Sequence, residues 1–240
     1  MKKAIFFDLD GTLLQMPQKK FEHEYFKLIT TKFAKLGYDA ELFQKAMWEG
    51  LKAMWTNPGE TTNENLFWTV FSKYYPDKIE FMQSVFEEFY FNEYNQIEEI
   101  VTKDKNIKPI LAWCKQNFDY VILATNPFFP TFGTNNRLKW IGLSLDDFDY
   151  VSTYENSCHS KPDPRYFEDL MNKFGLKPEE CIMVGNNQLE DYIVAKQVGI
   201  DALLTGEFIL PYEEATERPE VIKLENLVAE LEKLKNKIAK

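Results

Sequence analysis

The pattern of hydrophobic and polar positions changes character twice along the chain. Residues 4–7 form a short apolar run that ends in two acids, Asp8 and Asp10, as is typical of a strand buried on both faces of a parallel sheet. From about residue 21 to residue 94, apolar and aromatic residues recur at helical spacing with charged residues between them. After Lys105, helix-like and strand-like segments alternate, which predicts a doubly wound parallel sheet. The predicted fold class is α/β with an inserted all-helical segment.

The residues that interrupt the hydrophobic pattern predict where individual helices and strands begin and end. Gly, Pro, Asn and Asp interrupt the helical period at residues 36–39, 56–65 and 74–78, so we expect about four antiparallel helices in the inserted segment. We expect strands at 120–125, 148–154, 181–186 and 201–205, and helices at 107–118, 163–175 and 190–199. The tail from Val221 to Ile238 predicts a terminal helix packed on the sheet.

Composition and charge narrow the classes of function. A chain of 240 residues with 45% hydrophobic residues can form one α/β domain plus a smaller one. A formal charge of −10 argues against nucleic acid and anionic membranes as partners. The three cysteines are too widely spaced to indicate a zinc site or a disulfide framework. No apolar run approaches the length of a membrane span, so we expect a soluble, cytoplasmic protein.

The two acids after the first apolar run are the leading candidates for chemistry. Residues two apart on a strand project to the same side, so Asp8 and Asp10 can both face the crevice beyond the strand ends where ligands of such sheets bind. Gly11 and Thr12 allow the chain to turn tightly after the strand, and they add a hydroxyl and backbone N–H groups. Two acids spaced in this way also occur at ordinary solvent-facing strand ends, so the pair alone is a weak signal.

The longer string Asp-Leu-Asp-Gly-Thr-Leu-Leu resembles the first signature of the haloacid dehalogenase superfamily, which is dominated by phosphatases. Three further stretches follow in the family's order: Thr125 after an apolar strand, Lys161 in Ser-Lys-Pro-Asp-Pro, and Gly185 followed by Asn186 and later Asp191. The resemblance covers about residues 1–14 and 107–206. It implies a Rossmann-like core of residues 1–15 and 105–240, with residues 16–104 as a helical cap.

The resemblance also implies a role for each matching residue. Asp8 corresponds to the nucleophile that forms an aspartyl-phosphate, and Asp10 to the general acid and base. Thr125 and Lys161 complete the expected catalytic set. Their hydroxyl and ammonium groups would contact the phosphoryl oxygens, and Lys161 would also balance the charge of Asp8. Gly11 and Asn126 are expected to join these residues in binding the substrate.

The expected cofactor is Mg²⁺, and the sequence departs from the family where that ion binds. The expected metal ligands are Asp8, Asp10, Asn186 and Asp191. The family usually has an acid directly after the glycine, but Asn186 and Asn187 stand here. An amide oxygen can coordinate Mg²⁺ without carrying a charge. We therefore expect a weakened but working metal site.

These observations predict a Mg²⁺-dependent phosphatase that hydrolyses a small phosphorylated metabolite. Asp10 argues against a dehalogenase, because a halide leaves without needing a proton. Two alternatives remain: a non-catalytic or metal-impaired binding protein of the same fold, and a phosphotransferase with phosphoglycomutase-like activity. The inserted segment carries many aromatic residues at helical spacing, which indicates core, although one or two could line a substrate pocket: Trp48, Trp55, Phe67, Trp68, Phe71, Tyr74 and Tyr75. The sequence leaves the substrate and the choice between monomer and dimer open.

Overall fold

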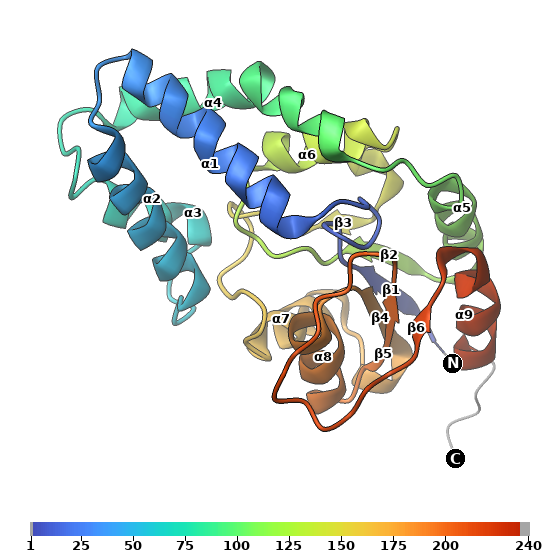
Figure 1. The fold of residues 1–240 in the computed structure, drawn as a ribbon. Helices are drawn as coiled ribbons and strands as arrows, with labels where there is room; N and C mark the ends of the chain where they lie inside the picture. The colour runs from blue at the N-terminus through green and yellow to red at the C-terminus, as the bar shows by residue number, and fades with distance from the viewer. Residues whose placement is uncertain (1, 236–240) are drawn as a thin grey trace.

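The computed structural model describes residues 2–235, and its centre is a six-stranded sheet in which every neighbouring pair is parallel (Figure 1). The strand order is β3-β2-β1-β4-β5-β6. The strands are β1 Ala4–Phe7, β2 Tyr120–Leu123, β3 Tyr150–Val151, β4 Cys181–Gly185, β5 Asp201–Thr205 and β6 Val221–Ile222. The direction in which strands are added changes at β1: β2 and β3 lie on one side of it, and β4, β5 and β6 lie on the other. The predicted doubly wound parallel sheet is confirmed.

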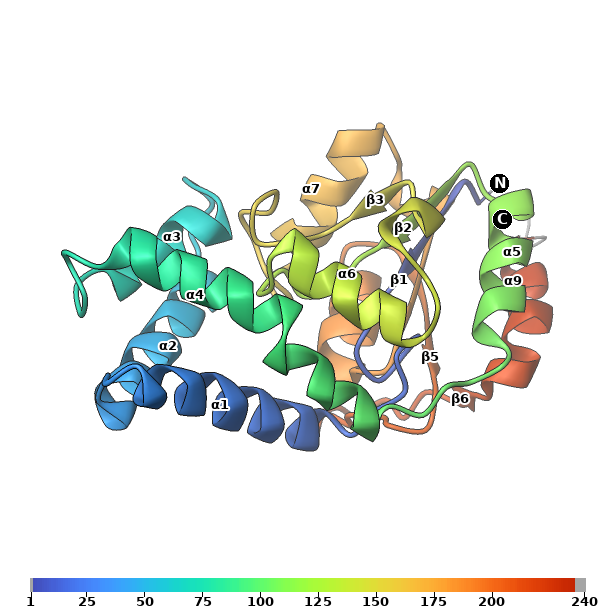
Figure 2. The same cartoon turned by 90° about the horizontal axis from the view of Figure 1, so that it is seen from above.

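Alternate residues of each strand contribute to two hydrophobic clusters on opposite faces of the sheet. Ile5 and Phe7 of β1 belong to the cluster that also contains residues of α5 and α9, whereas Ala4 and Phe6 pack with residues of α7 and α8. These helices are α5 Ile107–Asn117, α7 Arg165–Phe174, α8 Val194–Gln197 and α9 Leu227–Lys235. Figure 2 shows α5 and α9 side by side on one face, with α7 on the other. Burial on both faces explains the continuous apolar character of the strands.

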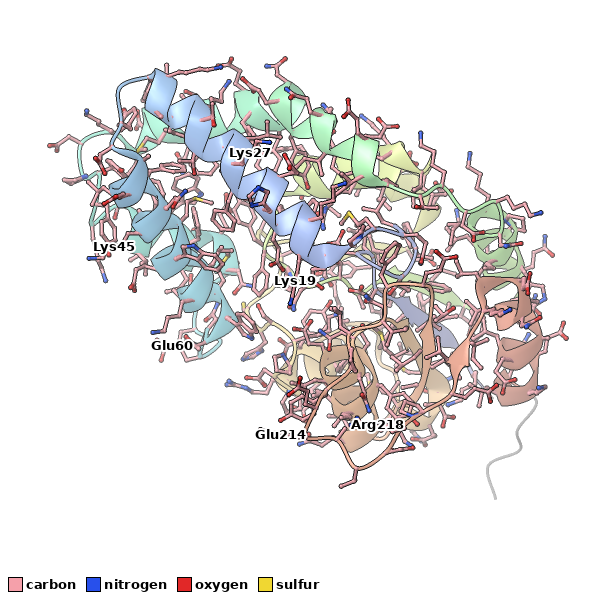
Figure 3. All side chains as sticks on the ribbon, in the orientation of Figure 1. Lys19, Lys27, Lys45, Glu60, Glu214 and Arg218 are labelled. Atoms are coloured by element: carbon pink, nitrogen blue, oxygen red, sulfur yellow. The ribbon has the colours of Figure 1, made fainter. Side chains whose placement is uncertain are left out.

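A helical block, made of α1 to α4 and the short 3₁₀ helix η1, follows β1 in the chain. Its elements are α1 Gln18–Lys35, α2 Ala40–Trp55, α3 Asn63–Phe71, α4 Ile79–Phe91 and η1 Glu93–Ile100. The four predicted helices are confirmed, and the breaks between them fall where Gly, Pro, Asn and Asp interrupt the period. The side chains of Asp39 and Thr62 cap α2 and α3 by accepting hydrogen bonds from backbone N–H groups. Lys27 and Lys45, labelled in Figure 3, belong to the exposed polar faces of α1 and α2.

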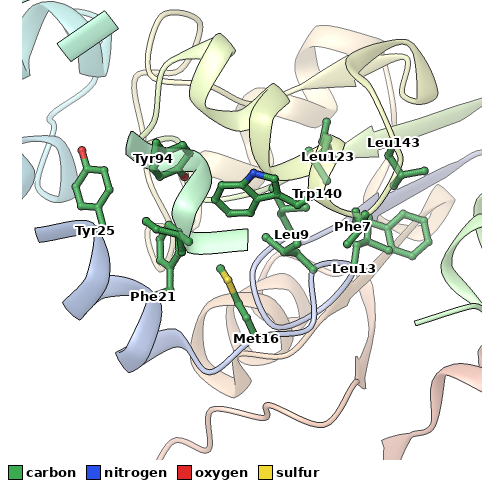
Figure 4. Close-up of a cluster of buried hydrophobic side chains, with 14 of the residues drawn as sticks. Phe7, Leu9, Leu13, Met16, Phe21, Tyr25, Tyr94, Leu123, Trp140 and Leu143 are labelled. Carbon is green, nitrogen blue, oxygen red and sulfur yellow. The ribbon is translucent and has the colours of Figure 1, made fainter. Parts of the chain in front are cut away.

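One hydrophobic cluster joins the helical block to a face of the sheet. Phe21 and Tyr25 of α1 pack with Tyr94 of η1, and the same cluster continues through Leu9 and Phe7 at the end of β1 (Figure 4). The block is thereby held over the carboxyl ends of the strands. A division into a core of residues 1–15 and 105–240 and a cap of residues 16–104 stays a prediction.

Four elements differ from the pattern-based expectation, and the first is the strand expected over residues 148–154, which spans only Tyr150–Val151. Helix α6, Thr131–Trp140, was not expected, because its Gly, Thr and Asn residues give no apolar helical period. The helix expected over residues 190–199 begins at Gln188, and its first six residues are π-helical. The tail does not begin as a helix: Val221–Ile222 pairs with β5, and α9 starts only at Leu227. The last residues of that expectation, 236–238, lie outside the described part of the chain.

None of the helices within residues 2–235 combines the length and apolar character needed to cross a bilayer.

Candidate active site

The polar residues that directly follow β1, β2 and β4 meet at one edge of the sheet. Strand β1 lies between the other two, and Phe7 is in register with both Leu123 and Val184. The carboxyl ends of parallel strands in register lie at the same edge. Asp8 is therefore placed centrally, with the segment that starts at Ala124 on one side and the segment after Gly185 on the other.

A buried ammonium group links the ends of β1 and β4. Lys161, which precedes α7 and is 1% exposed, donates hydrogen bonds from Nζ to Asp8 Oδ1 at 2.9 Å and to Asp191 Oδ1 at 2.6 Å. Burial by itself would lower the pKa of Lys161, but the adjacent carboxylates of Asp191 and Asp8 outweigh it and hold the pKa well above its usual value. Lys161 therefore stays charged at neutral pH.

The partner of Asp10 is Arg137, a residue that the sequence did not reveal. Arg137 is fully buried on α6, forms an ion pair with Asp10, and places its guanidinium carbon 4.2 Å from the ring centre of Phe129. Burial raises the pKa of Asp10 to about 6; Arg137 opposes this rise and the charge of Asp8 adds to it. Asp10 is thus able to hold a proton close to neutral pH. Arg137 lies in a segment without apolar periodicity or a recognised motif, so no sequence signal pointed to it.

Thr125 and Asn126 lie at the end of β2, as predicted. Thr125 is buried, and its backbone oxygen accepts a hydrogen bond from the Tyr166 hydroxyl at 2.9 Å. The Asn126 side chain accepts from the backbone N–H of Lys161 at 2.9 Å and donates to Glu190 Oε2 at 2.9 Å. Asn126 therefore braces the Lys161 segment in this structure, and its contact with a phosphoryl group stays a prediction.

Asp191 is held by the turn that follows β4. Its Oδ2 accepts hydrogen bonds from the backbone N–H groups of Asn186 at 3.1 Å and Asn187 at 2.9 Å. Gly185 makes this possible, because a Cβ there would lie 2.2 Å from Asp191 Cγ. Burial raises the pKa of Asp191 to about 6, although Lys161 opposes the rise.

Gly11 lets the loop after β1 approach the loop after β4 closely. Its φ of +85° is in the left-handed region, and a Cβ would lie 2.0 Å from Asn186 Nδ2, so only glycine permits this approach of the two loops. Its N–H donates to Leu14 O at 2.8 Å. That N–H is used inside the loop in this structure, and the part of Gly11 in binding the substrate stays a prediction.

The oxygen atoms of the predicted metal ligands differ in how far other groups of the protein already occupy them. Within residues 2–235, no group of three or more His, Cys, Asp and Glu side chains has a metal-holding arrangement. Asp191 is occupied by Lys161 and two backbone N–H groups, whereas Arg137 contacts only Oδ2 of Asp10 and leaves its buried Oδ1 without a partner among the described residues. Asp8 Oδ2 and Asn186 Oδ1 each lie 3.3 Å from Thr12 Oγ1, so both oxygens border the same hydroxyl group. Two such oxygens fit Mg²⁺, which keeps several waters in its coordination shell.

A cavity of about 720 Å³ lies between this cluster and the helical block. Asp8, Asp10, Thr125 and Asn126 line it on the sheet side, and aromatic residues line it on the side of the helices. The aromatic residues that indicated core differ in where they lie, and Phe67 is both buried and part of the cavity lining. Phe71 and Tyr75 are buried in the core, whereas Trp48 and Trp55 line the cavity with more than half of their surface exposed.

Comparison with known proteins shows which family this chain belongs to. The family model described as haloacid dehalogenase-like hydrolase matches residues 2–199, which confirms the resemblance seen in the sequence. The chain is 32% identical over 107 residues to the rhythmically expressed gene 2 protein of Drosophila melanogaster, covering 43% of this chain and 36% of that protein. It is 35% identical over 100 residues to a phospholysine phosphohistidine inorganic pyrophosphate phosphatase of Xenopus laevis, covering 38% and 37%.

These alignments span a little over a third of the length of the two curated relatives. The fold is shared over much more of the chain. The structure of a 2-haloacid dehalogenase from Pseudomonas syringae pv. Tomato DC3000 superposes with a TM-score of 0.62 at 19% identity, covering 97% of this chain and 99% of that one. At that identity the likeness concerns the fold alone.

Proposed function

Because this chain belongs to the haloacid dehalogenase-like hydrolases, we propose that it is a phosphatase that hydrolyses a small phosphomonoester through a phosphorylated Asp8. One observation carries the proposal: the charged Lys161 contacts Asp8 at 2.9 Å, while Asp10, whose pKa is raised to about 6, follows two residues later. One carboxyl group is thereby suited to attack phosphorus and the other to transfer a proton. The phosphatase named among the relatives supports this activity.

The proposed reaction has two displacements at phosphorus. In the first, an oxygen of Asp8 bonds to phosphorus while the bond to the alcohol oxygen breaks, and Asp10 gives its proton to that oxygen. In the second, a water oxygen bonds to phosphorus, Asp10 takes a proton from the water, and the bond to Asp8 breaks. Phosphate leaves and both acids return to their starting states. Covalent catalysis of this kind replaces one difficult displacement with two easier ones.

The surrounding residues would stabilise the charge on the phosphoryl group. Lys161 lies next to Asp8 and offers a fixed positive charge, and the Thr125 hydroxyl offers a neutral donor at the end of β2. Mg²⁺ would be held by oxygens of Asp8 and Asn186 and would neutralise part of the phosphate charge. Asp10 and Asp191, also predicted as ligands, would support the ion through its waters.

The replacement of an acid by Asn186 motivates the alternative of a binding protein without catalysis. Against it, the charged contacts among Asp8, Lys161 and Asp191 are intact, and Asp10 has a cationic partner. Phosphoryl transfer to a second hydroxyl uses the same first displacement. Analysis of the products separates transfer from hydrolysis, because only hydrolysis releases one phosphate for each alcohol.

We expect purified protein to hydrolyse p-nitrophenyl phosphate with Mg²⁺ and to lose at least about 90% of that rate in excess EDTA, because loss of metal ligation or its support costs about 10–100-fold. The release of p-nitrophenol measures the rate directly. Adding Mg²⁺ back controls for damage by the chelator. Absence of turnover with every divalent metal and across a broad panel of phosphomonoesters would establish the binding protein instead.

Replacing Arg137 with Met should move the alkaline limb of the pH profile of kcat/KM upwards by about one pH unit. Arg137 lowers the pKa of Asp10, so its removal raises that pKa further above about 6. The general acid must be protonated, and activity therefore falls as the pH rises through this pKa. Arg165→Met, which removes an exposed arginine, is the matched control and should leave the limb in place. An unshifted limb in a folded Arg137→Met variant would contradict the assignment of Asp10.

A further inference from the structure

The part of the cavity that lies toward the helices contains no basic side chain among its described lining residues. Lys19, Lys27 and Lys45, labelled on α1 and α2 in Figure 3, are not among the residues that line it. The cationic groups near the cavity, Lys161 and Arg137, are already paired with Asp8, Asp191 and Asp10 at the sheet side. A second anionic group on a substrate would therefore meet no free positive charge there.

The same walls carry carboxylates instead. Glu22, Glu64, Glu80 and Glu87 come from three helices and all line the cavity. No Lys or Arg forms an ion pair with any of these four in residues 2–235. Unpaired carboxylates around one cavity repel an anion and attract a cation.

Aromatic side chains line the same cavity as these acids. Trp48 is stacked on Phe26 with ring centres 4.7 Å apart, and both line the cavity. Trp48 is 55% exposed and Trp55 is 51% exposed, although side chains of this size are normally well buried. Trp48 and Phe26 also line a second cavity, formed by residues of α1 and α2. Exposed aromatic surface at a cavity is a mark of a binding site.

Glu64, Trp68 and Tyr154 line one part of the cavity together. Glu64 and Trp68 are one turn apart on α3 and therefore share a face of that helix. The backbone N–H of Glu64 donates to Tyr154 O at 2.8 Å, which brings the loop after β3 to the same place. Burial raises the pKa of Glu64, as does the nearby Glu155. A carboxylate beside tryptophan and tyrosine has the composition of sites that bind alkylammonium ions.

We propose that the alcohol part of the substrate carries an alkylammonium group, which binds between the aromatic side chains and Glu64 while the phosphate lies at Asp8. This inference rests on the proposed phosphatase activity and names its substrate class. It separates this chain from enzymes for pyrophosphate or for phosphorylated carboxylic acids, because those substrates would bring a second negative charge among the four glutamates.

Three phosphomonoesters test the proposal: phosphocholine, its uncharged isostere 3,3-dimethylbutyl phosphate, and 2-phosphoglycolate. We expect kcat/KM for phosphocholine to exceed that for the isostere by about tenfold and that for phosphoglycolate by more, since the isostere keeps the shape but loses the charge. Equal values for phosphocholine and the isostere, or a preference for phosphoglycolate, would overturn the proposal while leaving the phosphatase activity established.

Glu64→Gln should reduce the preference for phosphocholine over the isostere by about fivefold. Glu41→Gln is the matched control, because Glu41 lies in the first turn of α2 as Glu64 lies in the first turn of α3, but outside the cavity. The control should keep the full preference. If Glu64→Gln also keeps it, the carboxylate does not recognise the cation and the proposal is wrong.

A binding measurement provides a readout that does not depend on catalysis. Titration with tetramethylammonium should change the tryptophan fluorescence of the wild type saturably, and Trp68→Leu should weaken this binding by about tenfold. Saturable binding together with no hydrolysis of any phosphomonoester would refute the proposed function but uphold the cation site. Absence of saturable binding at millimolar concentration would overturn the cation site.

Discussion

Replacing Asp8 with Asn should lower kcat by at least about 10³-fold and abolish formation of a phosphorylated protein, because an amide oxygen does not act as the attacking nucleophile. The fold should persist. Asn keeps an oxygen that can accept the hydrogen bond of Lys161, and Asp191 still balances the charge of that ammonium. The measurements are steady-state rates with p-nitrophenyl phosphate, and trapping of a beryllium fluoride adduct in the presence of Mg²⁺.

The matched control for this variant is Asp39→Asn. Asp39 caps α2 far from the strand ends, and Asn is as good a capping residue as Asp, so neither stability nor kcat should change appreciably. Asp8→Asn with near wild-type turnover, or an adduct at another residue, would exclude Asp8 as the nucleophile. Circular dichroism of both variants verifies that any loss of rate is not a loss of fold.

Replacing Lys161 with Met should destabilise the protein by about 3–5 kcal/mol at neutral pH, because it leaves the buried carboxylates of Asp8 and Asp191 without their cation. It should also reduce kcat about 10²- to 10³-fold through loss of the charge that faces the phosphoryl group. Urea denaturation measures the change in the free energy of unfolding. Lys103→Met removes an exposed lysine and should cost less than about 1 kcal/mol.

The cost of Lys161→Met should depend on pH. Burial already raises the pKa of Asp191 from 3.8 to about 6 in the folded protein, with Lys161 opposing the rise. A carboxyl group with a raised folded pKa favours the folded state at low pH, and this contribution is lost as the pH rises through the folded pKa. Without Lys161 that pKa moves higher still, so the loss continues to higher pH. The difference in unfolding free energy between wild type and variant should therefore widen from pH 5 to pH 8; a constant difference would contradict this account.

The local pattern was sufficient to predict most of the elements. Continuous apolar runs bounded by Gly and Asp marked the strands, because strands buried on both faces exclude polar side chains. Periodic apolar residues with clear breaks marked the helices of the block. Helix α6 was missed because its stability comes from packing against neighbours, and its own residues carry no period. Strand β6 was missed for a related reason: two residues gain strand structure only by pairing with β5.

The site was predictable to the extent that motifs carry it. Asp8, Asp10, Thr125, Lys161 and Asp191 were found from short local strings, and the structure brings them to one edge of the sheet. Their catalytic roles stay predictions. The brace formed by Asn126 and the internal use of the Gly11 N–H depend on which partners lie nearby in space, and the local strings contain no information about those partners.

By itself, the sequence determined the family, the parallel sheet with its helical insertion, and the carboxylates at the end of the first strand. These features follow from residue type and spacing, which act over a few positions. Only the tertiary structure decided that Arg137 pairs with Asp10, that Asp191 is occupied by Lys161, and that unpaired glutamates and exposed tryptophans surround one cavity. Charge pairing and burial depend on distances between residues far apart in the sequence, 30 positions for Lys161 and Asp191 and 127 for Arg137 and Asp10, and those distances exist only once the chain has folded.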